Sequence, residues 1–561
     1  MSQYRPVLYG RTHAVSSGHA LATHAAAEIL RDGGNAIDAG VAAGIALGVL
    51  ESELVSIAGV APIILYSAEH DHVVTISGVG NWPALTNPEV FVREHDGKIP
   101  VGVLRTVVPA APDAWITALN RYGTMNFDEV AHFAIDFAAN GFHMYPLMAE
   151  LIGKNRSNFE RFASNAEIYL PDGDVPKVGE LFLQTDLARS LQFMADEARA
   201  GAKRGGRRAG LAAARDAFYR GDLARAILAH QQAEGGWLRA DDLEKFHVDI
   251  EEPLQVVFRG VDVYGCGAWC QGPLLLEMLK ILEPLDLPGL GHNSADYLHV
   301  LAETIKLGAA DRERFLGDPR QVDVPLAHIL SDGFAAQRRA CIDMTRATPA
   351  MPDPGDSPAA EPPVEGQMDT SYVCVVDRVG NVFSATPSDS SYNVPVVPGL
   401  GFVVSGRGSQ SWVDTSHPSA VAPGRRPRLT PNPALAMTAG TIIPFGSPGG
   451  DVQTQAMLQV LLNRLVFGMD VQSAVDAPRI ASYSFPSSFA PHESEPGVLR
   501  VEARIAETTR VDLAGRGHLV VDWPDSTWLA GSVSMIAADR TPAITLRAAA
   551  DHRRAGYAQA W

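Results

Sequence analysis

The sequence predicts an α+β protein in which β-sheets lie between layers of helices. Three observations lead to this prediction. Helical patterns open the chain, short runs of β-forming residues follow them, and a strand pair near residue 372 is followed by a long amphipathic helix. A chain of 561 residues is also long enough to bury a core of that size.

The first elements are punctuated by clear stop and start signals. Apolar residues recur at helical spacing in Leu21–Arg31, and Gly33-Gly34 ends that helix. Asn35 can cap a second helix over 36–50, whose small residues would allow close packing on a sheet. Strands are expected at 63–66 and 73–76. Further helices are expected at 127–140, 187–198, 214–233 and 272–282.

The segment 199–215 is rich in Arg, Lys, Gly and Ala. A basic patch can indicate a polyanion partner, but in an acidic protein it is more often a solvated surface loop. We therefore expect a surface loop here.

A second distinctive segment, 348–365, is proline-rich and cannot build a packed core, so it is expected to be an exposed linker. It leads into β-forming residues at 372–376, a turn at 377–381 and a return strand at 382–386. A threonine, Thr370, thus stands where the linker meets a core hairpin.

That position suits an N-terminal nucleophile. If the bond before Thr370 breaks, Thr370 gains a free α-amine beside its own Oγ. An α-amine has a pKa near 7.7–8.0, so it is partly neutral at physiological pH and can act as the base for the hydroxyl.

The run Gly446-Ser447-Pro448-Gly449-Gly450 precedes a helix expected over 451–467. Glycines at a helix N-terminus let backbone N–H groups point at a ligand and favour negative charge. The oxyanion of a tetrahedral intermediate fits such a place.

The composition sets limits on function. The net charge of −18 argues against broad binding of nucleic acid or anionic membranes. The four cysteines show no zinc or disulfide spacing, which indicates free thiols in a reducing compartment. No metal site or cofactor motif is present, and no signal peptide or apolar run of membrane-spanning length is recognised, so a cytoplasmic location is expected.

Several stretches resemble the γ-glutamyltranspeptidase family. They are Thr370-Ser371-Tyr372-Val373-Cys374-Val375-Val376-Asp377, the Gly33–Ala39 run, the block from Ala310 to Pro319, and the tail 551–557. The resemblance implies the four-layer αββα fold of the N-terminal-nucleophile hydrolases. It also implies self-cleavage between Asp369 and Thr370. Fragments 1–369 and 370–561 would then stay associated as one intertwined globular unit.

The same resemblance implies roles for particular residues. Thr370 would be the nucleophile, Ser388 would replace a second hydroxyl that hydrogen-bonds it, and Gly449 and Gly450 would form the oxyanion hole. The family's contacts to the γ-glutamyl head group are altered. They fall here on Ser390, Arg407, Gln410 and Thr430, while the arginine of the large fragment falls near Val79. Without an acidic partner, an ammonium group should be rejected.

The leading hypothesis is therefore an autoprocessed amidohydrolase that cleaves a small amide other than a γ-glutamyl one, through an acyl-enzyme. Arg407 would bind a carboxylate or carbonyl of the substrate, unless it is simply an arginine of the polar loop 405–426. One alternative is a true γ-glutamyl hydrolase or transferase. Another is an uncleaved, non-catalytic binding protein on the same fold. The sequence leaves open whether the fragment heterodimer pairs further into a homo-oligomer.

Overall fold

The computed structural model describes residues 4–353, 369–540 and 544–561. Residues 354–365 of the expected linker therefore lie outside the described residues. Two seven-stranded sheets, each antiparallel throughout, form the centre of the molecule. The first sheet has the order β1 (Leu8–Gly10), β18 (Thr545–Ala550), β17 (Ser534–Asp539), β13 (Thr441–Gly446), β12 (Ala434–Met437), β9 (Val261–Gly265), β8 (Leu254–Phe258).

The second sheet contains the hairpin that was expected near residue 372. Its order is β19 (Tyr557–Ala560), β2 (Ala14–Ser17), β10 (Val373–Val376), β11 (Val382–Ala385), β3 (Ile63–Ser67), β4 (His72–Ile76), β7 (Ile250–Glu251). Both sheets thus contain strands from before and from after residue 370. Alternating side chains here, Tyr372 just before β10 and Cys374 and Val376 within it, enter the apolar layer between the sheets.

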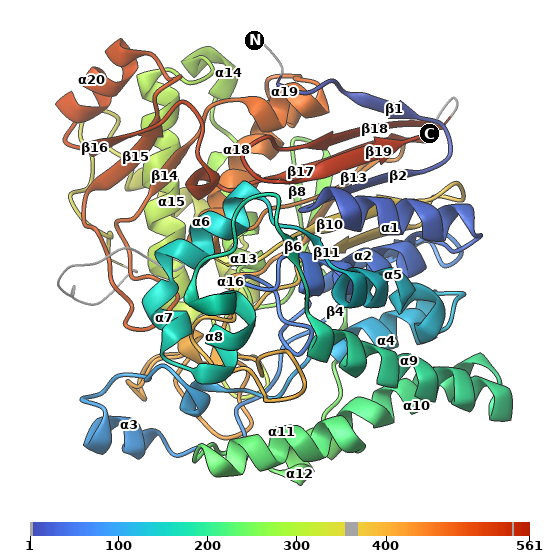
Figure 1. Ribbon diagram of the computed structural model, residues 1–561. Coiled ribbons are helices and arrows are strands. Elements are labelled where there is room, and N and C mark those ends of the chain that lie inside the picture. The colour runs from blue at the N-terminus through green and yellow to red at the C-terminus, as the bar shows by residue number, and fades with distance from the viewer. Residues whose placement is uncertain (1–3, 354–368, 541–543) are drawn as a thin grey trace.

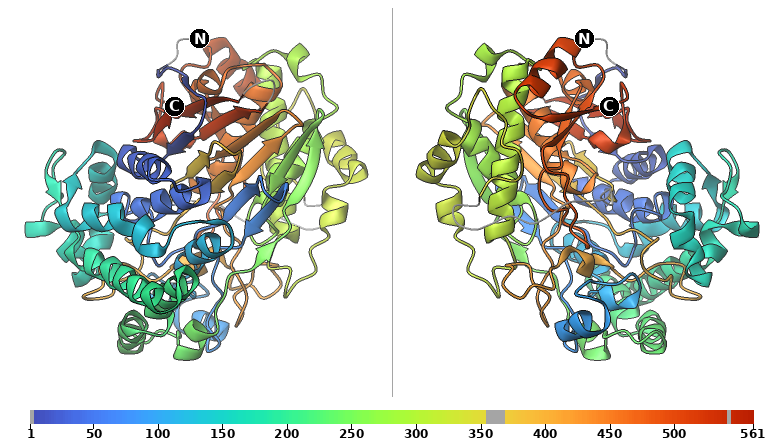
Figure 2. Two further views of the ribbon diagram at one scale, coloured as in Figure 1. Left: turned by 90° about the vertical axis from the view of Figure 1, so that its right-hand side faces the viewer. Right: turned by 90° about the vertical axis from the view of Figure 1, so that its left-hand side faces the viewer.

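Helices cover both outer faces, so the molecule has four layers, α, β, β and α (Figures 1 and 2). On the second sheet lie α1 (Ala20–Arg31) and α2 (Ala36–Leu50), covered in turn by α4 (Ala111–Tyr122), α5 (Phe127–Asn140), α9 (Thr185–Gly205) and α10 (Arg207–Tyr219). On the first sheet lie α13 (Gly272–Leu282), α18 (Gln453–Leu465) and α19 (Val471–Asp476), with α15 (Ala295–Phe315) packed on α13. The predicted fold class is confirmed.

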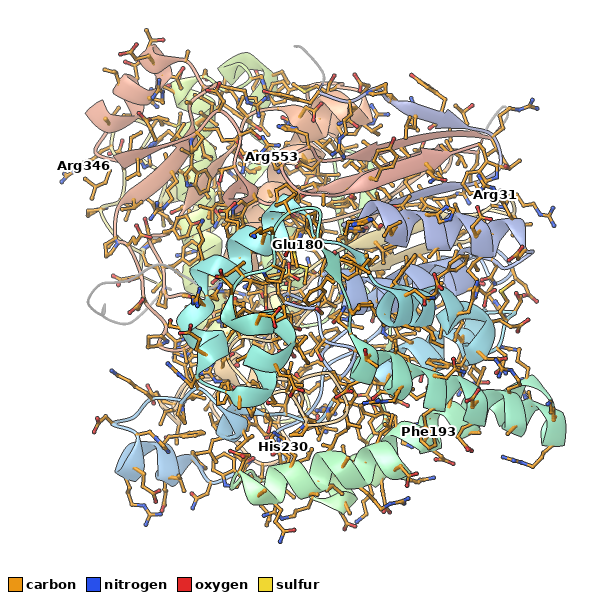
Figure 3. All side chains as sticks on the ribbon, viewed as in Figure 1. Arg31, Glu180, Phe193, His230, Arg346 and Arg553 are labelled. Atoms are coloured by element: carbon orange, nitrogen blue, oxygen red, sulfur yellow. The ribbon has the colours of Figure 1, made fainter. Side chains whose placement is uncertain are left out.

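Shorter elements complete the chain. The other helices are α3 (Pro88–Glu94), α6 (Pro146–Lys154), α7 (Arg156–Glu160), α8 (Ala163–Tyr169), α11 (Asp222–Ala233), α12 (Ala240–Glu244), α14 (Leu287–Leu290), α16 (Leu326–Ile329), α17 (Asp332–Ala340) and α20 (Glu507–Gly515). The small sheets join β14 (Ile480–Ser482), β15 (Val498–Glu502) and β16 (Leu519–Trp523), and β5 (Phe142–His143) with β6 (Leu181–Phe182). Figure 3 shows side chains filling the layers, with Arg31 and Arg346 pointing outward at opposite edges. In the part of the chain that is described, no helix has both the length and the apolar character for crossing a membrane.

Helix α2 explains how the second sheet and its helices fit together. Asn35 and Asp38 form a capping box at its start, as expected from the sequence. Every residue of the helix is buried, because it lies between the sheet and the outer helices. A Cβ added at Gly40 would lie 2.1 Å from the ring of Phe383 on β11, so only glycine allows this approach. The close packing predicted from the small residues is confirmed.

The expectation of a loop over 199–215 is wrong. The segment forms the end of α9 and most of α10, and only Gly206, with φ of 77°, separates the two helices. Its alanines and arginines are good helix formers, and Leu211 and Ala214 are buried against neighbouring helices. Arg199, Lys203, Arg204 and Arg208 are exposed on the polar face of this helix pair, whereas Arg215 is buried and pairs with Asp113.

Candidate active site

Thr370 lies at the entrance of β10, fully buried, with an unusual backbone conformation. Its φ is 101°, a value that a β-branched residue rarely adopts. Its Oγ1 lies 2.6 Å from Ser388 Oγ and 3.0 Å from Asp369 Oδ1. Strain of this kind persists only where the surrounding structure enforces it, and it concentrates at functional sites.

The glycine turn meets the Asp369–Thr370 bond from the other sheet. The backbone N–H of Gly449 donates to the carbonyl oxygen of Asp369, with an N···O distance of 3.3 Å. Gly449 and Gly450 have φ values of 125° and 54°, which glycine adopts without strain. The N–H of Gly449 thus points at the oxygen that would become negative when this bond is attacked. Gly450 is the next residue and begins the short helix η4 (Gly450–Val452).

The turn is held in place by one of the blocks that carried the family resemblance. Asp451 follows the glycines and pairs with the buried Arg312 of α15. Gln271 donates to the same carboxylate at 2.8 Å. The Ala310–Pro319 block therefore supports the glycine turn from the large-fragment side.

Arg407 is buried, although the simplest interpretation of the sequence makes it an arginine of a solvated loop. It is 1% exposed, so it is not an arginine of a solvated loop. Its Nη2 donates to Asp369 Oδ2 at 2.6 Å and also to Ser388 Oγ. It lies in η3 (Arg407–Gln410). Its guanidinium therefore contacts both the carboxylate of Asp369, before the predicted cleavage site, and the hydroxyl of Ser388 beside Thr370.

Asp389 holds the turn that carries Arg407. Its Oδ1 accepts from the Gly406 N–H at 3.0 Å, its Oδ2 accepts from Ser405 Oγ at 2.5 Å, and Arg407 Nε lies 3.7 Å away. Burial raises the pKa of Asp389 to about 6, against the opposing effect of Arg407. The carboxylate is thus still largely ionised at neutral pH.

The remaining predicted substrate contacts lie around the same arginine. Gln410 accepts from Arg407 Nη1 at 3.3 Å and donates to Thr430 Oγ1 at 3.0 Å, so these three residues form one chain of hydrogen bonds. Both Gln410 and Thr430 are fully buried. Ser390 is buried at 9% exposure in the segment after Ser388, but no direct bond joins it to Thr370 or Arg407.

Gln453 also reaches the Thr370 hydroxyl and was not singled out from the sequence. Its side-chain amide lies 3.3 Å from Thr370 Oγ1. With its oxygen facing that hydroxyl, its nitrogen donates to the carbonyls of Ser447 and Thr430, at 3.0 and 3.3 Å. This orientation satisfies both ends of the amide. Its position three residues after Gly450, in the first turn of α18, was the available signal.

A second charged group lies on the other side of Thr370 and was also missed. Arg554 Nη1 donates to the Thr370 carbonyl at 3.1 Å. Glu51 and Glu53 follow α2 and are buried, and each has one carboxylate oxygen without a hydrogen-bond partner among the described residues. Burial raises the pKa of Glu51, and burial together with Glu51 raises the pKa of Glu53 to about 8. No local sequence pattern marks these residues.

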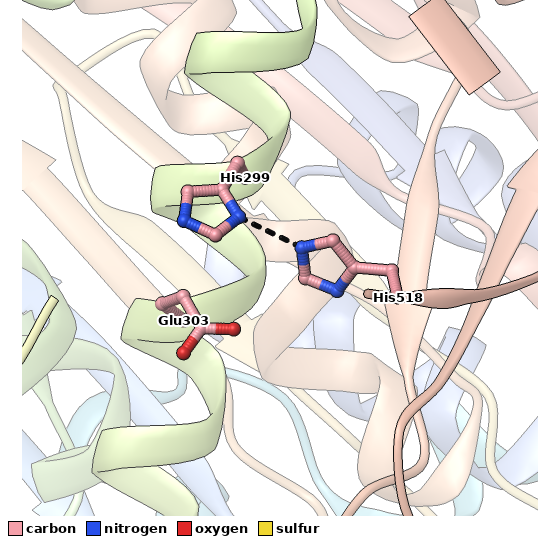
Figure 4. A group of neighbouring side chains, drawn as sticks. All are labelled: His299, Glu303 and His518. Carbon is pink, nitrogen blue, oxygen red and sulfur yellow. Dashed lines mark hydrogen bonds between the residues drawn. The ribbon is translucent and has the colours of Figure 1, made fainter. Parts of the chain in front are cut away.

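Figure 4 shows a separate group, His299, Glu303 and His518, with the donor types of a metal site. Most of its donor atoms already have partners within the protein, although Nδ1 of His518 has none among the described residues. His299 Nδ1 and His518 Nε2 lie 2.8 Å apart, His299 Nε2 donates to the Asp343 carbonyl at 2.8 Å, and Glu303 pairs with Lys306 at 2.8 Å. A nearby buried cation also disfavours a further one. We therefore assign no metal to this group.

Comparisons with known proteins agree with this geometry. The sequence model described as "Gamma-glutamyltranspeptidase" matches residues 22–561. The chain is 32% identical to the "Acylase ACY 1 proenzyme" of Pseudomonas sp. (strain SE83) over 540 residues, which covers 93% of this chain and 89% of that protein. It is 31% identical to the "Glutathione hydrolase-like YwrD proenzyme" of Bacillus subtilis (strain 168), covering 94% and 95%. The crystal structure of cephalosporin acylase from Bacillus halodurans superposes with a TM-score of 0.86 at 27% identity, covering 100% and 98%.

Proposed function

Because this chain belongs to the gamma-glutamyltranspeptidase family of autoprocessed amide hydrolases, we propose which bond it cleaves in itself and which amides it then hydrolyses. It cuts between Asp369 and Thr370, and Thr370 becomes the N-terminal nucleophile. The mature enzyme is an acylase for amides whose acyl group carries a carboxylate and lacks the α-ammonium of a γ-glutamyl group. Membership in a family of hydrolases argues against the non-catalytic alternative.

The position of Asp369 carries this proposal. Asp369 is the acyl half of the bond to be cleaved, so it occupies the site that a substrate acyl group takes later. Its carbonyl oxygen faces the N–H of Gly449, and its carboxylate pairs with Arg407 at 2.6 Å. In an aspartyl residue two carbons separate the scissile carbonyl from the carboxylate, as in a succinyl amide. The precursor therefore holds a built-in model of its substrate.

The burial of Arg407 explains why the mature site would bind a carboxylate. Once Asp369 leaves the site, the guanidinium remains buried but loses its carboxylate partner. A buried, unpaired charge is unfavourable, and a charge-assisted hydrogen bond to a new carboxylate removes that penalty. A succinyl group reproduces the spacing of Asp369, and a glutaryl group exceeds it by one methylene.

The surroundings of Arg407 disfavour a γ-glutamyl ammonium. The predicted head-group residues Ser390, Gln410 and Thr430 are neutral. Asp389 is the acidic side chain that stays beside Arg407, and its oxygens already accept from Ser405 and Gly406. An ammonium group placed there would be desolvated without a free anionic partner.

The catalytic cycle follows from the same contacts. The free α-amine of Thr370 takes the hydroxyl proton as Oγ attacks the amide carbon, and the N–H of Gly449 stabilises the oxyanion. Ser388 and Gln453 orient the hydroxyl. The protonated amine then gives its proton to the leaving amine, and water resolves the acyl-enzyme. An amine in place of water would give acyl transfer.

A panel of p-nitroanilides tests the proposal. The succinyl, glutaryl, butyryl and γ-glutamyl anilides are compared by kcat/KM, with Thr370→Ala as the blank. We expect the succinyl or glutaryl anilide to exceed the uncharged butyryl anilide by about 10–100-fold, the value of one charge-assisted hydrogen bond. Equal turnover of the butyryl anilide would remove the role of the carboxylate. Preference for the γ-glutamyl anilide would favour the γ-glutamyl hydrolase alternative instead.

A further inference from the structure

The precursor lacks the base that the mature enzyme uses. Before cleavage the nitrogen of Thr370 is part of a peptide bond, and an amide nitrogen does not accept a proton at neutral pH. Some other group must take the proton from Thr370 Oγ when the chain cuts itself. Among the described residues, three side chains lie within hydrogen-bond distance of that oxygen, Ser388, Asp369 and Gln453, at 2.6, 3.0 and 3.3 Å.

The hydrogen bonds around Ser388 decide where the Thr370 proton points. Arg407 has only donors, and it donates to Ser388 Oγ. The Ser388 hydroxyl can then donate its own proton to Thr370 Oγ1. This leaves the proton of Thr370 for an acceptor, and Asp369 Oδ1 is nearer than the amide of Gln453 and is the carboxylate of the three.

We infer that the Asp369 side chain is the general base for self-cleavage, a group that acts once and then leaves the site as the new C-terminus of the large fragment. The inference rests on the proposed cleavage between Asp369 and Thr370. It gives Asp369 two functions in the precursor, the acyl group that is attacked and the base that activates the attacking hydroxyl.

The carboxylate is well placed for this role. Its Oδ1 accepts from Thr370 Oγ1 while its Oδ2 is fixed by Arg407, so the two oxygens have separate tasks. The positive φ of Thr370 holds its side chain next to the preceding residue. Asp369 is 2% exposed, so bulk water does not compete for the proton. Its charge is balanced by Arg407, whose own charge is shared with Asp389.

The step balances as follows. Thr370 Oγ forms a bond to the Asp369 carbonyl carbon while Asp369 Oδ1 takes the hydroxyl proton, and the N–H of Gly449 stabilises the oxyanion. The C–N bond then breaks, and the carboxylic acid returns the proton to the departing nitrogen, which becomes the α-amine. An ester now joins Asp369 to Thr370 Oγ. Water hydrolyses this ester to the Asp369 α-carboxylate and the free hydroxyl.

The experiment compares self-cleavage with later turnover in Asp369→Asn, which keeps the shape of the side chain. The cleaved fraction is followed by intact mass, and the activity is expressed per cleaved molecule. We expect self-cleavage to slow by about 100-fold or more, in the range of general-base effects, and Asp369→Glu to be slowed less. The cleaved Asp369→Asn enzyme should match the wild type in kcat/KM within about twofold, since residue 369 has left the site.

Asp389→Asn is the matched control, because it removes a second buried carboxylate beside Arg407 that does not touch Thr370 Oγ. Asp389 stays in the mature enzyme, so its effect should appear in both self-cleavage and kcat/KM. Self-cleavage of Asp369→Asn at the wild-type rate would overturn the inference. An equal loss in both measurements for Asp369→Asn would also overturn it, since that result indicates a structural role.

If Asp369→Asn does not cleave at all, Asp369→Ala with added formate decides the question. Acceleration by formate supports the missing-base role, and no acceleration over a concentration series contradicts it. N-terminal sequencing of the wild-type small fragment separates this inference from the proposed function. A fragment that does not begin at Thr370 would refute the proposed cleavage site itself.

Discussion

The two sides of Thr370 are both buried and charged, but they differ in how their charges are paired. On the acyl side, the carboxylate of Asp369 faces Arg407, and that of Asp389 accepts from Ser405 and Gly406. On the other side, Glu51 and Glu53 each have one carboxylate oxygen without a hydrogen-bond partner among the described residues. Nε and Nη2 of Arg554 also have none.

This difference reflects the fact that the chain is still uncleaved. On the acyl side of the precursor the chain's own Asp369 pairs with Arg407, although Nε of Arg407 has no hydrogen-bond partner among the described residues. The other side contains two carboxyl groups and one guanidinium around the Thr370 carbonyl, before any α-ammonium exists. Cleavage adds a positive charge at Thr370 beside this acidic group. We therefore expect the unpaired side, which comprises Glu51, Glu53 and Arg554, to have its charges better balanced in the mature enzyme than in the precursor.

The largest effect is expected from Thr370→Ala, which removes the nucleophile common to both sides. Self-cleavage should stop, because no hydroxyl can attack the Asp369 carbonyl. Intact mass should then show one chain of 59.9 kDa that persists on incubation, and no anilide should be turned over above background. A cleaved Thr370→Ala protein would mean that another residue is the nucleophile.

The next largest effect is expected when the guanidinium of Arg407 is removed from the acyl side of the mature enzyme. Arg407→Met should lower the succinyl-to-butyryl ratio of kcat/KM by about 10–100-fold, because only the succinyl group pairs its carboxylate with the guanidinium, whereas loss of the contact with Ser388 affects both substrates alike. Arg479→Met is a suitable control, since it removes another buried arginine, one that pairs with Asp551 at 2.6 Å. Arg479→Met should leave the succinyl-to-butyryl ratio unchanged. An unchanged ratio in Arg407→Met would contradict the proposed substrate class.

The smallest effect concerns the stability of the unpaired side. The pKa of Glu53 is raised to about 8 in the folded precursor, so the folded state loses stability as pH rises from the unfolded pKa, near 4.5, to about 8. In the uncleaved Thr370→Ala background, Glu53→Gln should therefore raise Tm more at pH 9 than at pH 5. The gain corresponds to a few kcal/mol at most, at about 1.4 kcal/mol per unit of pKa shift.

Two comparisons sharpen this measurement. Glu94→Gln, at an exposed position of α3, controls for the loss of one carboxyl group. In the cleaved enzyme the gain from Glu53→Gln should shrink near pH 7, where the α-amine of Thr370 is still mostly protonated, and much less at pH 9, where most of it is neutral. The same gain at pH 5 and pH 9 would show that the charge of Glu53 is not the cause.

Much of the layered fold could be predicted because it depends on local patterns. Helical periodicity, the Asn35 cap and the turn after β10 all act within a few residues, and the structure has them as expected, except that the helix expected over 214–233 is divided between α10 and α11. The prediction of a loop over 199–215 was wrong because it gave more weight to the charge of the segment than to its helix-forming residues. The order of strands in the two sheets could not be derived locally, since β10 pairs with β2, which lies far away in the sequence near the N-terminus.

By itself, the sequence determined the hairpin that begins after Thr370, the glycine turn at the start of a helix, and the layers that contain them, because backbone preferences and turn chemistry are properties of short segments. Only the tertiary structure decided the charges of the site. Arg407 meets Asp369 across a separation of 38 residues, and Arg554 meets Thr370 across 184. Whether such a group is a solvated surface charge or a buried partner depends on what the fold packs around it, and no local pattern contains that information.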